Sequence, residues 1–100
     1  MIIERMIQEI FPDKWGDLEQ IDKKYNAAEA RLGFPPKKRF QYLMGVHPFG
    51  TLIIEREWPS MAALEEANMK SLMDPEYQSL REKSGKIIRK VHWEVLMPMP

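Results

Sequence analysis

Two polar side chains, Tyr42 and Arg56, fall at apolar positions of the alternating segment 39–58. We expect this segment to form a hairpin that places them opposite each other on the face toward the core. An arginine on such a face needs a carboxylate, an aromatic ring or a bound anion. The pair therefore indicates an anchor for an acidic or phenolic ligand. The alternative is an arginine that reaches past Tyr42 to solvent at the rim of the sheet.

Three further side chains are candidates for the wall of a binding cavity: Trp58, Asn68 and Trp93. Asn68 lies one helical turn from Leu64 and Leu72, so a helical stripe carries its amide toward the sheet, where it could orient a carbonyl or hydroxyl group. The two tryptophans could form aromatic walls. The alternatives are an amide bonded to neighbouring backbone and tryptophans that only fill the core.

The histidines, His47 and His92, are the side chains that titrate near neutral pH, and neither has a partner at a metal-binding spacing. His92 shares one face of the alternating segment 90–97 with Glu94, so the two could form an acid–base pair for proton abstraction. The alternative is a polar contact across a dimer interface. His47 begins a turn and is expected to be solvated. We predict no metal site and no cofactor.

Composition excludes several classes of protein. The chain has 100 residues, with 15 basic and 15 acidic side chains and no cysteine. This length predicts one domain over residues 1–100, and the zero net charge argues against nucleic-acid and anionic-membrane partners. The absence of cysteine excludes disulfides, thiolate zinc sites and cysteine nucleophiles. Glu4 and Arg5 interrupt the start where a signal peptide needs an apolar run, so we expect a cytoplasmic protein.

The hydrophobic periods change along the chain in the order strand, helix, strand, strand, helix, strand. In about 100 residues this order predicts an α+β fold, the ferredoxin-like βαββαβ plait, with a four-stranded antiparallel sheet and its helices on one face. The expected elements are a strand over 2–11, a helix from the cap Asp13 to Gly33, the hairpin over 39–58, a helix from the cap Ser60 that restarts at Asp74 and Pro75, and a strand over 90–97.

The register of the hairpin follows from its loop. A three-residue loop over 48–50 places Gly50 at the left-handed position that such loops require. It sets Tyr42 opposite Arg56 and Phe40 opposite Trp58 on the face toward the helices. The other face has no helix to cover it, and it is expected to mix acidic with apolar side chains. Pairing with the same face of a second copy would cover it, which predicts a homodimer.

The segment LIIEREWPSMAALEEA and the helix break DPEYQSL resemble the dimeric α/β-barrel superfamily, which includes antibiotic-biosynthesis monooxygenase-like and NIPSNAP-like domains. The resemblance covers nearly the whole chain. It implies a homodimer whose two sheets form a barrel, with a ligand cavity in each subunit between the sheet and its helices. Members oxidise polycyclic aromatics or quinols without a cofactor, degrade heme, isomerise lactones or have no known activity.

Three functions remain open from the sequence. The first is a homodimeric small-molecule-binding protein. The second is a cofactor-independent monooxygenase or isomerase that acts on a small aromatic or quinol-like substrate in the same cavity. The third is a structural or regulatory dimer whose cavity is filled by its own side chains. Heme degradation is disfavoured because members of that kind place an axial histidine on a helix, whereas His47 and His92 are expected in a turn and a strand. The residues expected to line the cavity are Tyr42, Arg56, Trp58, Asn68 and Trp93.

Overall fold

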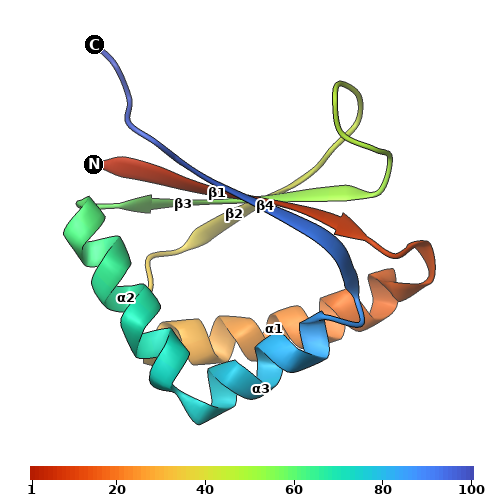
Figure 1. Ribbon diagram of the computed structural model, residues 1–100, viewed down its shortest axis with the longest axis horizontal. Helices are drawn as coiled ribbons and strands as arrows, with labels where there is room; N and C mark the ends of the chain where they lie inside the picture. The colour runs from red at the N-terminus through yellow and green to blue at the C-terminus, as the bar shows by residue number, and fades with distance from the viewer.

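The computed structural model describes all 100 residues as one layer of strands and one layer of helices (Figure 1). The four strands form one sheet in the order β2-β3-β1-β4, and all neighbours are antiparallel. This arrangement confirms the predicted α+β ferredoxin-like fold. The elements are β1 (Ile2–Ile10), a 3₁₀ turn η1 (Pro12–Lys14), α1 (Trp15–Arg31), β2 (Lys37–Gln41), β3 (Thr51–Trp58), α2 (Met61–Met73), α3 (Pro75–Ser84) and β4 (Ile88–Leu96).

The helix boundaries follow from capping residues at three of the predicted positions. The Ser60 hydroxyl accepts a hydrogen bond from the backbone N–H of Ala63, and the chain turns at Gly33 with φ +80° after α1 ends. The expected cap at Asp13 is wrong. Asp13 lies inside η1, and α1 begins at Trp15 without a side-chain cap. None of the helices has the length and apolar character that a membrane span needs.

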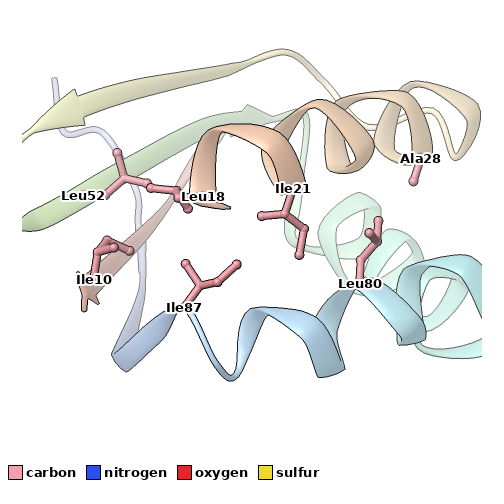
Figure 2. Packing of buried hydrophobic residues seen from close by; sticks show 7 residues of the cluster. All are labelled: Ile10, Leu18, Ile21, Ala28, Leu52, Leu80 and Ile87. Atoms are coloured by element: carbon pink, nitrogen blue, oxygen red, sulfur yellow. The ribbon is translucent and has the colours of Figure 1, made fainter. Parts of the chain in front are cut away.

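The core lies between the helices and one face of the sheet and has two parts. The larger part joins β1, β3, α1 and α3, and in Figure 2 its side chains point toward one another across the space between α1 and α3. The smaller part fixes α2 to the sheet through four buried side chains, Ile2, Trp58, Leu64 and Ala67. The even-numbered residues of β1 face this core, as its period-two pattern requires.

The predicted hairpin register is wrong. Strand β2 ends at Gln41, and nine residues, 42–50, connect it to β3. Lys37 pairs with Arg56 and Phe40 with Ile53, a shift of five positions from the expected register. Because the shift is odd, it turns Phe40 and Tyr42 to the face away from the helices.

Charge pairing explains the register that forms. On the helix face of β2, Lys37 Nζ lies 2.7 Å from an Asp22 carboxylate oxygen, and Arg39 forms an ion pair with Glu19 of α1. On the other face, Lys38 stands opposite Glu55. Opposite charges on facing positions stabilise a strand pair, whereas the predicted register offers β2 none of these partners. The apolar residues expected to extend β2 are instead exposed in the connection, with Met44 88% and Val46 92% exposed.

The junction between α2 and α3 forms as predicted. Asp74 accepts a hydrogen bond from the backbone N–H of Tyr77, and Pro75 occupies the first position of α3. Both Asp74 carboxylate oxygens also accept from the Arg31 guanidinium, at 2.9 and 2.8 Å. These bonds, that of Arg31 first, hold the pKa of Asp74 below its ordinary value of 3.8. The ionised side chain therefore ties the end of α1 to the α2–α3 junction.

Asp74→Asn removes the charge but keeps the helix cap, because asparagine caps a helix as well as aspartate does. A carboxyl with a lowered pKa in the folded state stabilises the fold above its unfolded pKa and loses that contribution as the pH falls through the lowered value. We expect the variant to be less stable than the wild type at neutral pH, with a difference that shrinks below pH 3.8. Urea midpoints at several pH values measure this. A difference that does not vary with pH would contradict it.

Candidate functional site

A cavity of about 620 Å³ lies between the helix face of the sheet and the helices. Its size is typical of small-molecule sites, and 13 of its 26 lining residues are hydrophobic. Strands β1, β3 and β4 form one wall, and α1, α2 and α3 form the other. The apolar part of the wall includes Met6, Leu18, Ile21, Leu52, Ile54 and Phe34.

A buried carboxylate, that of Glu4, lines this cavity at the centre of the sheet. Its two oxygens accept hydrogen bonds from two indole N–H groups, Trp58 Nε1 at 2.9 Å and Trp93 Nε1 at 2.8 Å. The donors come from β3 and β4, the strands on either side of β1. Glu4 forms no ion pair. A carboxyl group can accept more hydrogen bonds than these two.

Arg56 lies beside Glu4 in the β1–β3 register but is paired elsewhere. Its Nη2 lies 2.9 Å from a Glu29 carboxylate oxygen, and its Nε donates to the Pro35 carbonyl oxygen at 2.8 Å. The guanidinium also lies over the Phe34 ring, 5.2 Å from its centroid. The side chain is only 7% exposed, so the alternative in which it reaches solvent at the rim of the sheet is wrong. Its charge is balanced inside the protein.

Two tyrosines of the helix layer also line the cavity, Tyr25 of α1 and Tyr77 of α3. Their rings pack edge to face with centroids 5.4 Å apart. Burial raises the pKa of Tyr77 well above its ordinary value, and the nearby Glu29 carboxylate adds to the shift. Burial likewise raises the pKa of Tyr25, whose hydroxyl is bonded to the Ser84 hydroxyl at 2.7 Å. Both phenols are therefore neutral at physiological pH.

Gln8 contributes a second polar group to the same wall. It lies four residues after Glu4 on the helix face of β1, only 7% exposed, and its amide makes no hydrogen bond within the protein. Arg39 Nε is the one fully buried side-chain polar atom without a partner, so the polar atoms of the Gln8 amide are accessible from the cavity. The amide is consequently available to a bound molecule.

Gln8→Met replaces this amide with an apolar side chain of similar shape. We expect the stability of the variant to stay within about 1 kcal/mol of the wild type, because no hydrogen bond within the protein is lost and the amide atoms are not fully buried. Urea unfolding measures the difference. Glu9→Gln, on the other face of the same strand, is the control and should change stability little. A destabilised Gln8→Met would mean that the amide has a partner in solution.

The predicted site residues are divided between the two faces of the sheet. Arg56, Asn68 and Trp93 line the cavity, and Trp58 is buried beside it with its indole N–H on Glu4. Tyr42 does not line it. Because of the register shift, Tyr42 lies on the other face, with its ring 5.1 Å from that of His47.

The proposed acid–base pair, His92 and Glu94, lies on the face of β4 away from the cavity. Both side chains are exposed, and no hydrogen bond joins them. Glu94 is 3.6 Å from the Arg5 guanidinium, and the His92 ring lies 6.3 Å from that of His47. No three His, Asp or Glu side chains form a cluster that could hold a metal ion.

Sequence reasoning missed Glu4 and Gln8 as site residues. The available signal was the period of two in β1, which places both on the same face as Ile2, Met6 and Ile10. A carboxylate on a core-facing strand position is rarely buried without a partner. The identity of its partners depends on the pairing of β1 with both β3 and β4, which the sequence does not show residue by residue.

Neither the protein-family models nor the curated protein sequences contain a match to this chain. Solved structures do match it in fold. A NIPSNAP-like domain protein from Burkholderia xenovorans superposes with a TM-score of 0.80 at 18% identity, over 98% of this chain and 84% of that one. A NIPSNAP family protein from Agrobacterium tumefaciens gives 0.79 at 18% identity, over 98% and 85%. An antibiotic biosynthesis monooxygenase gives 0.72 at 14% identity, over 100% of both chains. The chain therefore has the fold that NIPSNAP-like domains and antibiotic-biosynthesis monooxygenases share, as the resemblance in sequence implied.

Proposed function

We propose that the protein is a homodimer that binds a small molecule in the cavity between its sheet and its helices. The observation that carries this proposal is the cavity itself, which is large, half apolar and furnished with the Glu4 carboxylate and the Gln8 amide. Such a combination of apolar wall and few polar groups is typical of ligand sites. A structural dimer with a filled core would not need this volume or an amide that faces it without a hydrogen-bond partner within the protein.

The exposed side of the sheet supports the homodimer. Figure 1 shows all helices on one side of the sheet, with the 42–50 connection and the C-terminal tail on the other. Exposed apolar side chains gather on this side: Phe40, Leu43, Met44, Val46, Phe49 and Met97. A soluble monomer rarely exposes so many together, and a twofold pair of sheets would cover them.

The second candidate is a cofactor-independent monooxygenase that uses the same cavity. It is favoured by the antibiotic biosynthesis monooxygenase among the structures of the same fold. In this reaction the substrate itself activates oxygen, and the protein supplies orientation and a site that excludes water. Oxygen consumption in the presence of a quinol separates this function from binding alone.

Native mass spectrometry of the purified protein, followed by identification of any molecule released on denaturation, tests the proposal. We expect a dimer that carries a small adduct. Phe40→Glu should yield monomers, because it places a charge on the uncovered face where Phe40 is 46% exposed. Met73→Glu, at an exposed position of α2, is the matched control and should remain dimeric. A wild-type monomer would contradict the homodimer, and a cavity that binds none of a set of aromatic probes would contradict ligand binding.

A further inference from the structure

We infer that the cavity selects a ligand with a primary ammonium group, and that the Glu4 carboxylate is the anchor for this group. The inference rests on the proposed small-molecule binding and adds the chemical class of the ligand. It starts from the position of Glu4, which is 8% exposed, lines the cavity and forms no ion pair within the protein. A buried acidic side chain is usually paired with a cation, and here no side chain supplies one.

The hydrogen bonds of Glu4 favour its charged form. Each of its two oxygens accepts one indole N–H, from Trp58 and from Trp93. An indole N–H only donates, so donors directed at both oxygens stabilise the carboxylate, which only accepts. The two indoles come from β3 and β4, on either side of β1, and hold the group from both sides. Folding has therefore already removed this carboxylate from bulk water and oriented it.

The largely buried charges of the cavity wall carry one negative charge in excess. Arg56, the neighbour of Glu4 in the β1–β3 register, is paired with Glu29. Lys37 lies between Glu29 and Asp22 and is paired with both. These two cations balance these two carboxylates, which leaves the charge of Glu4 uncompensated. A cation at Glu4 would neutralise the wall, whereas an anion would add a second uncompensated charge in surroundings of low dielectric constant.

The exposed basic side chains of the cavity do not supply the missing charge. Arg81 and Arg89 line the cavity, but both are exposed, so water and salt screen them. Arg89 is also remote from the anchor. It lies six residues before Val95, the β4 partner of Glu4, which corresponds to about 20 Å along the strand. The carboxylate therefore dominates the electrostatic environment at its own end of the cavity.

A primary ammonium group fits this anchor better than other cations. It carries three N–H donors on a compact charge, and the carboxylate can accept more hydrogen bonds than the two from the indoles. Hydrogen bonds between opposite charges are roughly twice as strong as those between neutral groups. Because the carboxylate is already desolvated and oriented, binding requires the loss of water from the ligand alone. A quaternary ammonium ion has the same charge but no N–H to donate.

The wall beside Glu4 provides an apolar surface for the body of the ligand. Met6 follows Glu4 on the helix face of β1 and pairs with Ile54 of β3 and Trp93 of β4, and all three side chains line the cavity. An apolar chain attached to the ammonium group can contact this surface, and methionine adapts to its shape. The site thus combines a charged anchor with an adjoining apolar wall.

Four compounds with a six-carbon chain test the inference by isothermal titration calorimetry in phosphate buffer at neutral pH. Hexylammonium has the charge and the N–H donors, hexyltrimethylammonium has the charge alone, hexanol is uncharged and hexanoate is an anion. We expect the wild type to bind hexylammonium at least about tenfold more tightly than hexanol, to bind hexyltrimethylammonium more weakly than hexylammonium, and to bind hexanoate most weakly. In Glu4→Gln the preference for hexylammonium over hexanol should disappear. Glu9→Gln removes the same charge on the opposite face of β1 and should retain it.

Each outcome of this series decides a separate point. Equal binding of hexylammonium and hexanol by the wild type would overturn the selection of a cation while the cavity proposal stands. Binding of hexyltrimethylammonium as tight as that of hexylammonium would overturn the role of the N–H donors. A preference that survives in Glu4→Gln, or that is lost equally in Glu9→Gln, would overturn the assignment of the anchor to Glu4.

Absence of binding separates the inference from the proposed function. If none of the four compounds binds although aromatic probes do, the inference fails and the cavity function stands. If no probe of either kind binds, both fail. The wild-type series decides these points even if Glu4→Gln does not fold.

Discussion

Substituting Glu29→Gln is expected to lower the free energy of unfolding by about 3 kcal/mol. Glu29 is buried on α1 and is the common partner of two buried cations, at 2.9 Å from Arg56 Nη2 and 3.2 Å from Lys37 Nζ. Glutamine keeps the shape of the side chain but removes its charge. Arg56 would then have no carboxylate partner, and removing one member of a buried pair leaves the other charge uncompensated. Urea unfolding with a constant m value measures the loss.

Glu19→Gln is the matched control for this prediction. Glu19 lies on the same helix and pairs with Arg39, but its side chain is 57% exposed. Exposed ion pairs contribute little because water screens them, so we expect a loss of less than about 1 kcal/mol. Equal losses in the two variants would contradict the prediction, since they would mean that burial does not distinguish the two ion pairs.

The architecture could be predicted from local patterns because these patterns agree with the packing. The period of two in β1 and β4, the cap at Ser60 and the restart at Asp74 each depend on near neighbours in the chain. Hydrophobic periodicity and capping report such local preferences well. They were therefore sufficient to identify the order of the elements and the fold.

The register of β2 could not be predicted because residues far from the hairpin decide it. The expected loop was chosen from Gly50, which does have a positive φ of 89°. The ion pairs of Lys37 and Arg39 with α1 favour the longer connection. A turn residue can therefore be identified correctly even though tertiary contacts decide the register of the strand before it. Here the register that forms places Tyr42 on the other face of the sheet.

The candidate site was predicted only in part for a similar reason. Asn68 and Trp93 follow the periodicity of their own elements into the cavity wall. Glu4 becomes a candidate only when β3 and β4 bring two indole groups to it from positions 54 and 89 residues away in the chain. Arg56 shows the reverse case. Its residue type suggested an anchor for a ligand, but its guanidinium is already paired with the Glu29 carboxylate.

Leu64→Ala is expected to lower the free energy of unfolding by about 3 kcal/mol or more. Leu64 is fully buried, at 0% exposure, and packs with Ile2, Trp58 and Ala67 in the part of the core that fixes α2 to the sheet. The truncation removes apolar contacts and leaves a space that the rigid sheet cannot close. Since Leu64 also supports Trp58, the same change should loosen the indole that holds Glu4.

Leu72→Ala makes the same truncation two turns later on α2, where the side chain is 47% exposed. Its loss of stability should be less than about 1 kcal/mol, because little apolar surface leaves the interior. Urea unfolding compares the two variants directly. If they lose the same amount, Leu64 does not fix α2 to the sheet, and the position of Trp58 must depend on its contacts with Phe34 and Ile2 instead. A large loss of stability in Leu64→Ala alone would indicate that the ordered position of the Glu4 carboxylate depends on the attachment of α2 to the sheet.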